Sequence, residues 1–180
     1  MEREKWFERS FDFTVPLVRF PSVVERLRGT PARIEERTRD LPKDLLTRRD
    51  NAHWSVQENV GHLLDLEPLW LRRAEQFFVN DAELVPADLT NRRTHEANHN
   101  AHELRDLLAA FRAARTQFME LLTRADDAIL ARTALHPRLR TPMRLIDLAL
   151  FVAEHDDHHL AGITELVVRW GHVPRQQVRS

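Results

Sequence analysis

Apolar residues recur every three or four positions over long stretches of this chain. That spacing is the period of an amphipathic α-helix, whereas a half-buried strand would alternate apolar and polar residues. Glycine, which weakens helices, is scarce, with four residues in a chain of 180. The pattern therefore predicts an all-α fold in which four long helices form a bundle.

Capping residues mark where the four helices are expected to start. The expected capping residues are Ser22, Ser55, Asn100 and Thr141. Ser55-Val-Gln-Glu58 matches a capping box, and the helix after it is expected to reach Phe78. Pro68 falls inside that helix and predicts a kink. The first helix is expected to break at Gly29-Thr30-Pro31 and to restart after it.

The remaining segments lack a sustained apolar period. Residues 80–98 are mostly polar and predict a long connection between the second and third helices. Residues 1–19 are expected to form an irregular or short helical arm that packs against the bundle. A chain of 180 residues is expected to fold as one domain, residues 1–180, with the bundle spanning residues 20–175.

Composition and charge narrow the classes of function. The 27 basic and 28 acidic residues give a net charge of −1 and are interleaved, so a nucleic-acid partner is not expected. No apolar run approaches the roughly 20 residues that cross a bilayer. The N-terminus does not resemble a secretion signal either, so we expect no membrane partner and a cytoplasmic location. Because the chain has no cysteine, any metal must be held by imidazole or carboxylate groups.

Ten histidines are the one unusual feature of the composition. His155 and His159 lie four residues apart, so their rings share one helical face and can converge on one cation. Leu148 and Val152 occupy the same sector of the helix, which predicts that both rings point into the bundle. His62 has a comparable position on the second helix. Three such imidazoles would hold one divalent transition metal and leave an open coordination position.

Two other interpretations of the histidines compete with a metal site. A pair at this spacing can also consist of ordinary core histidines bonded to carbonyls, although an inward-facing His62 makes that less favoured. His95-Glu96-Ala97-Asn98-His99 matches the HExxH pattern of zinc proteases, but its polar surroundings favour a polar connection instead. The other histidines singled out are expected to be solvated, namely His53, His136, His158 and His172.

Two carboxylates and one glycine flank the predicted site. Glu58 lies one turn before His62 and Asp65 about one turn after it, so either could orient a ligand or act as a general base. For Glu58 the capping role is the stronger assignment. Gly162, near the centre of the histidine face, either opens a path for substrate or allows close packing.

Four segments of the chain carry a resemblance to a known family, residues 54–67, 136–139, 143–148 and 153–160. They resemble the DinB-like or YfiT-like metalloenzymes, and the similarity covers most of the chain. The resemblance implies a four-helix bundle whose metal ligands fall on His62, His155 and His159. Members include transferases and isomerases that depend on low-molecular-weight thiols, as well as proposed hydrolases. Dimers are frequent in the family, and this alone suggests a homodimer.

The expected function is therefore that of a divalent-metal-dependent transferase or hydrolase. It would act on a small-molecule substrate, with a low-molecular-weight thiol as the co-substrate of a transferase. Zinc is the first expectation for the ion, and nickel or iron also fits imidazole ligands. Its open position could activate water or hold a small thiol as thiolate. The alternative is a non-catalytic metal-binding or stress-associated interaction protein whose site only stabilises the bundle.

Overall fold

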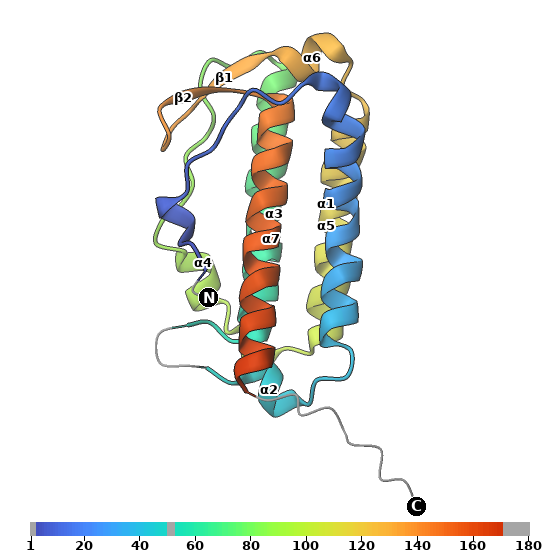
Figure 1. The fold of residues 1–180 in the computed structure, drawn as a ribbon, viewed down its shortest axis with the longest axis vertical. Helices are drawn as coiled ribbons and strands as arrows, with labels where there is room; N and C mark the ends of the chain where they lie inside the picture. Colours follow the sequence, from blue (N-terminus) through green and yellow to red (C-terminus); the bar gives the residue numbers. More distant parts are fainter. Residues whose placement is uncertain (1–2, 50–52, 171–180) are drawn as a thin grey trace, which may run out of the picture.

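Four long helices packed side by side form the body of the molecule (Figure 1). The computed structural model describes residues 3–49 and 53–170. The long helices are α1 (Phe20–Thr38), α3 (Val56–Phe78), α5 (Leu104–Thr123) and α7 (Leu145–Arg169). Helix α1 lies against α5 and α7, and α3 lies against the same two helices. The predicted four-helix bundle is confirmed, and Pro68 lies inside α3 as expected.

The direction of the helices explains the long connection between α3 and α5. These two neighbouring helices run the same way, so the chain has to return along the length of the bundle between them (Figure 1). Residues 79–103 make this return and contain helix α4 (Arg92–Glu96) and the 3₁₀ turn η3 (His99–Ala101). A connection of this length was predicted, and the parallel arrangement is its cause.

The segment before α1 runs along the same side of the α3–α7 pair as this connection (Figure 1). It contains two 3₁₀ turns, η1 (Trp6–Glu8) and η2 (Leu17–Arg19). The guanidinium of Arg144 ties it to the start of α7 by donating to the carbonyls of Phe13 and Val15, at 3.1 and 2.8 Å. Two extended segments therefore cover one face of the bundle.

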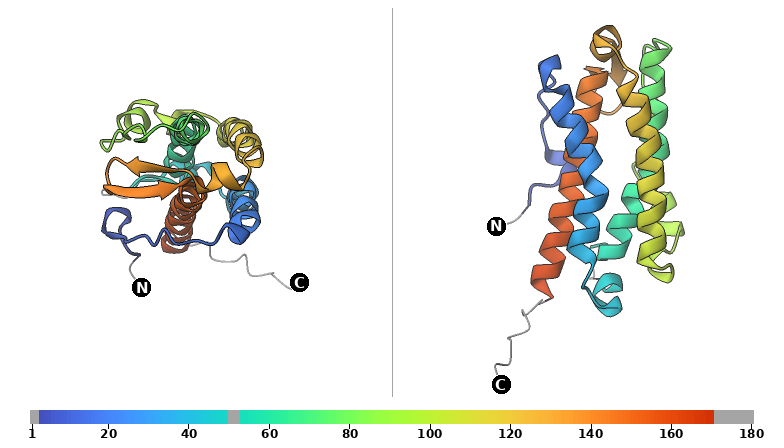
Figure 2. Two further views of the ribbon diagram at one scale, coloured as in Figure 1. Left: turned by 90° about the horizontal axis from the view of Figure 1, so that it is seen from above. Right: turned by 90° about the vertical axis from the view of Figure 1, so that its right-hand side faces the viewer.

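A short β-hairpin, which the helical pattern did not predict, lies across one end of the otherwise helical bundle (Figure 2). Strand β1 (Thr133–His136) pairs antiparallel with β2 (Thr141–Arg144). Thr141 was expected to cap the fourth helix, but it belongs to β2 and α7 begins at Leu145. The carboxylate of Asp147 accepts a hydrogen bond from the Arg144 backbone N–H at 3.0 Å, which caps the helix there.

The third long helix also begins later than predicted. Asn100 does not cap it, because the residue lies within η3 and its Oδ1 accepts a hydrogen bond from Ser55 Oγ at 2.7 Å. Glu103 is the capping position of α5 instead. The predicted capping box of Ser55 and Glu58 at the start of α3 is confirmed. Two further short helices were not predicted, α2 (Lys43–Thr47) and α6 (Asp127–Ala131).

Helix α1 passes through Pro31 without the predicted break. Proline has no N–H, so the carbonyl of Leu27, four residues earlier, loses its usual helical donor. Arg115 on α5 replaces that donor, since its Nη1 lies 3.1 Å from the Leu27 oxygen. A neighbouring helix thus satisfies the carbonyl that the proline leaves free.

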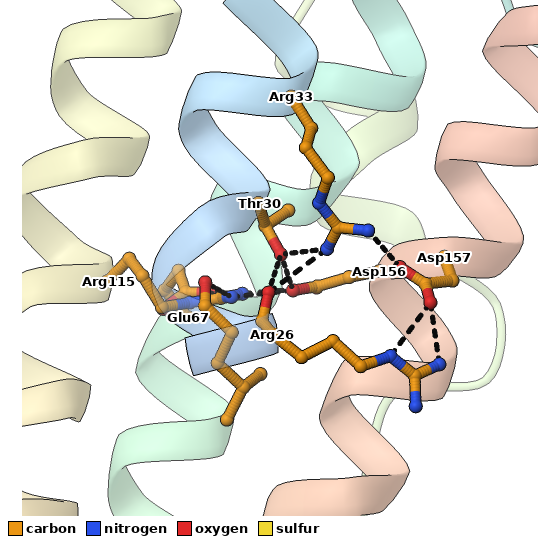
Figure 3. A network of polar contacts seen from close by, with 8 residues as sticks. Arg26, Thr30, Arg33, Glu67, Arg115, Asp156 and Asp157 are labelled. Atoms are coloured by element: carbon orange, nitrogen blue, oxygen red, sulfur yellow. Dashed lines mark hydrogen bonds and ion pairs between the residues drawn. The ribbon is translucent and has the colours of Figure 1, made fainter. Parts of the chain in front are cut away.

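The same arginine is the centre of a buried ion cluster to which all four long helices contribute (Figure 3). Arg115 donates to Glu67 on α3 at 2.6 Å and to Asp156 on α7 at 2.5 Å. Thr30 on α1 donates to Asp156 at 2.7 Å. The side chains of Arg115, Glu67 and Asp156 are 2, 1 and 0% exposed. Burial alone would lower the pKa of Arg115, but the two carboxylates raise it, so the guanidinium stays charged.

This ion cluster separates the core into two apolar groups. One group surrounds Trp70 and Phe118 and lies toward the hairpin. The other surrounds Leu63 and Phe111 and lies toward the start of α3. Asp157 is half-buried and pairs with arginines of α1 (Figure 3). Across the described ranges, no helix is long and apolar enough to cross a bilayer.

Replacing Arg115 with methionine should destabilise the fold strongly, because two buried carboxylates lose their cation. We expect the free energy of unfolding in urea to fall by about 3–5 kcal/mol. The matched control is Arg112→Met on the same helix, whose half-exposed guanidinium pairs with Glu35 at 2.6 Å. That variant should lose less than about 1 kcal/mol. Equal losses would show that the buried cluster contributes no more than a surface pair.

Candidate metal centre

His62, His155 and His159 lie together between α3 and α7. Each offers one ligand nitrogen, and these atoms all lie within 4.8 Å of one another. The three side chains are buried, and their ring centroids are 4.6 to 5.3 Å apart. The structure thus brings together the three histidines that helical spacing had selected.

A pair of hydrogen bonds fixes the orientation of His62. The Thr94 hydroxyl lies 2.9 Å from Asp65 Oδ2 and 3.1 Å from His62 Nδ1. Because a carboxylate only accepts, the hydroxyl donates to Asp65 and must accept from His62. His62 therefore carries its proton on Nδ1 and keeps the lone pair of Nε2 free for a ligand.

His159 is oriented in the same way by an amide. Asn59 Nδ2 donates to the Ser55 carbonyl at 2.8 Å, so its Oδ1 faces His159 Nδ1, which donates to it at 2.8 Å. In His155, Nδ1 is buried and has no hydrogen-bond partner among the described residues. Two lone pairs held ready and one unsatisfied buried nitrogen fit a bound cation.

Burial keeps the three imidazoles neutral. It lowers the pKa of His62 to about 4. Burial, reinforced by the neighbouring imidazoles, lowers the pKa of His155 and of His159 well below the usual range. At pH 7 protons therefore do not compete for the lone pairs. Neutral ligands would leave a divalent ion its full charge.

Tryptophan rings enclose the histidines on two sides. The Trp54 ring lies 4.6 Å from that of His62, measured between centroids. The rings of Trp6 and Trp70 lie 4.9 and 5.7 Å from that of His155. Trp6 comes from the N-terminal segment and Trp54 from the residues just before α3, so parts of the chain outside the long helices complete the site.

The histidines open onto a cavity of about 1080 Å³. Its walls come from α3, α7, the N-terminal segment, the α3–α5 connection and the hairpin. The ligand cluster comprises three histidines and no carboxylate of the described residues. An ion held there would have a coordination position left for a molecule in the cavity.

The two predicted carboxylates do not line this cavity. Glu58 caps α3 and pairs with Arg49 at 2.5 Å. Asp65 is linked to His62 through the Thr94 hydroxyl. Burial would raise the pKa of Asp65, but hydrogen bonds from His99 and Thr94 lower it on balance. The geometry is that of a residue which orients His62, and it gives neither carboxylate access as a general base.

The HExxH segment does not form a protease site. Helix α4 ends at Glu96, and Asn98 has a left-handed backbone with φ of 48°. His95 is exposed, whereas His99 is buried and its Nε2 donates to Asp65 Oδ2 at 2.8 Å. The two histidines therefore do not share a helical face.

His99 packs directly on the glycine that precedes His62. A Cβ atom at Gly61 would lie 2.2 Å from the His99 ring, so only glycine leaves room for it. Gly162 is less tightly packed, since a Cβ there would lie 3.0 Å from the flexible end of the Arg3 side chain. It also lines the cavity, so its position fits both the expected close packing and the expected path for substrate.

Several buried polar residues were missed or misjudged in the sequence. His136 is buried against Arg73 and was wrongly expected to be solvated, and His158 is half-buried. His53 is exposed as expected, and His172 lies outside the described residues. Thr94 was not found because it lies in the connection, where no periodicity relates it to His62.

A four-helix bundle with three buried, neutral histidines facing a cavity is typical of proteins that hold a single transition metal. The chain belongs to the DinB superfamily, whose profile matches residues 26–163.

The solved structures that share the fold include the following two. YfiT from Bacillus subtilis, described as a probable metal-dependent hydrolase with an unusual four-helix bundle topology, matches with a TM-score of 0.77 and 22% identity over 91% of this chain and 94% of that one. The mycothiol-dependent maleylpyruvate isomerase matches with a TM-score of 0.64 and 8% identity over 86% of this chain and 67% of that one. No curated protein sequence matches the chain.

Replacing Thr94 with valine should weaken metal binding, because His62 loses the acceptor that holds its tautomer. We expect the affinity for zinc to fall about 10- to 100-fold with unchanged stoichiometry, measured by competition with a chromophoric chelator. Thr116→Val on the exposed face of α5 is the matched control. If both variants bind zinc equally well, the hydrogen bond to His62 has no role in binding.

Proposed function

We propose that this protein is a metal-dependent enzyme acting on a small molecule, either as a transferase that uses a low-molecular-weight thiol or as a hydrolase. The observation that carries the proposal is the cluster of three buried imidazoles, with ligand atoms within 4.8 Å, that opens onto a large cavity. His62, His155 and His159 would hold one divalent ion. Membership of the DinB superfamily and the descriptions of the two solved relatives support this assignment.

Other residues of the chain would orient the ligand imidazoles and shield them from water. A divalent ion bound there would supply a Lewis acid able to activate water or a small thiol. Asn59 and the Thr94–Asp65 pair hold the ligand imidazoles in one orientation, which limits the rearrangement needed to bind an ion. Trp54 restricts access of bulk water to the histidines.

Zinc is the proposed ion, because three imidazoles with one open position match its tetrahedral preference. Nickel and iron are also compatible with an all-nitrogen donor set. The non-enzymatic alternative is a metal that only stabilises the bundle. A closed structural site would need a fourth protein ligand, and the cluster offers none among the described residues.

Metal analysis tests the ligand set. We expect about one zinc per chain after reconstitution, and we expect His155→Ala to abolish this binding. The control is His95→Ala, since His95 is exposed and belongs to the competing HExxH segment. Circular dichroism should show that both variants keep their helices. Binding lost with His95→Ala and kept with His155→Ala would overturn the proposed site.

The open coordination position can be tested with cobalt. Adding a low-molecular-weight thiol such as 2-mercaptoethanol to the cobalt-substituted protein should produce a sulfur-to-cobalt charge-transfer band that the His62→Ala variant lacks. Such a band supports the thiol-dependent transferase, whereas ester hydrolysis without thiol supports the hydrolase. If neither a thiol nor water exchanges at the metal, the site is closed and the structural alternative replaces the enzymatic one.

A further inference from the structure

Two arginines line the same cavity as the three histidines, at the end nearer the hairpin. Arg73 comes from α3, and Arg138 comes from the turn between β1 and β2. Neither forms an ion pair with a carboxylate of the described residues. This distinguishes them from Arg115, whose charge is balanced by Glu67 and Asp156.

Arg73 is the more deeply buried of the two, at 2% exposure. Its Nε donates to the Val85 carbonyl at 2.9 Å, and its Nη1 lies 3.2 Å from His136 Nε2. A guanidinium and an imidazole are poor mutual counter-ions. Burial and the charge of Arg138 lower the pKa of Arg73 to about 10, so it remains a cation at pH 7.

Arg138 is half-buried, and its guanidinium carbon lies 5.2 Å from the centroid of the Phe7 ring. Its Nη2 is buried and has no hydrogen-bond partner, and the side chain makes no hydrogen bond with any described residue. Arg140, two residues later in the same hairpin, pairs with Glu83 at 3.2 Å. Glu83, a carboxylate of the α3–α5 connection, therefore pairs with the exposed arginine of this hairpin and not with Arg138 at the cavity.

Two cations without a counter-ion at a partly desolvated wall are unfavourable unless an anion joins them. The three carboxylates that line the cavity, those of Glu4, Asp88 and Glu165, are engaged by other residues. None of them pairs with Arg73 or Arg138, so the anion of a ligand can neutralise these two guanidiniums.

An apolar surface connects these arginines to the histidines. The Trp70 ring centroid lies 5.5 Å from the Arg73 guanidinium carbon and 5.7 Å from the His155 ring. Leu66 and Leu69 line the wall beside it. Arg73 follows His62 by 11 positions, a rise of about 16 Å. Both side chains lean toward the N-terminus, and the longer arginine reaches further in that direction, which shortens the distance.

We propose that Arg73 and Arg138 bind the carboxylate of an organic acid whose reacting group lies at the three histidines. Two guanidiniums with free donors match the two oxygens of a carboxylate. The apolar wall between the two ends selects a substrate with a hydrocarbon body. The link between the anion site and the reacting end rests on the proposed function, but the anion site itself does not.

Calorimetry with hexanoate and hexanamide tests the anion site on the metal-free and the zinc-loaded protein. We expect hexanoate to bind at least about tenfold more tightly than the neutral amide, and Arg138→Gln to remove this preference. Arg140→Gln, in the same hairpin, is the matched control and should keep it. Equal binding of acid and amide, or equal effects of the two substitutions, would overturn the anion site.

On the metal-free protein, hexanoate binding is independent of the metal chemistry, because no ion is present for its carboxylate to coordinate. If the cobalt–thiol band is absent but hexanoate binds as expected, the proposed function is wrong and the anion site is retained. If the band appears but hexanoate does not bind, the anion site is wrong and the proposed function is retained. The link is tested by 6-mercaptohexanoate against 6-mercaptohexanol on the cobalt protein. We expect the acid to give the charge-transfer band at an at least about tenfold lower concentration, and Arg138→Gln to equalise the two thiols. If the acid and the alcohol give the band at equal concentrations in the unsubstituted protein, one ligand does not occupy the anion site and the metal site together.

Discussion

A guanidinium buried where four helices meet restricts how those helices can be arranged. Arg115 must reach carboxylates on α3 and α7 and a carbonyl on α1 at the same time. Glu67 lies five positions after His62, and Asp156 directly follows His155. Any sliding of α3 against α7 that separated the histidines would also pull a carboxylate from the buried cation. The ion cluster therefore sets the register on which the metal site depends.

The buried ionisable groups on the two sides of α7 differ in charge. Toward the bundle centre, charge is kept and balanced by opposite charge. Toward the cavity, burial holds three imidazoles neutral, so that positive charge can come from an ion. Further along the same cavity, Arg73 and Arg138 stay positive without a carboxylate partner among the described residues. The cavity thus joins an end suited to a cation with an end suited to an anion, a polarity that favours elongated ligands with different ends.

Helical periodicity in the sequence was enough to predict the bundle and to select His62, His155 and His159, because inward-facing positions repeat regularly along a helix. It could not locate Thr94 or His99, which reach the site from the connection through contacts between residues far apart in the chain. The hairpin was missed because Thr141 followed by a proline is also a helix-start signal. His136 looked solvated for the same reason, since only the hairpin places it against Arg73.

The proline within α1 makes the folding of this helix depend on its packing against α5. Without Arg115, the Leu27 carbonyl has no donor, and a proline inside an isolated helix costs about 3 kcal/mol. An isolated α1 should therefore lose its helical structure around Pro31, and the helix becomes continuous only once α5 has packed against it. Forming this helix and assembling the bundle are then one cooperative event, so an intermediate with α1 detached yet fully helical should not accumulate.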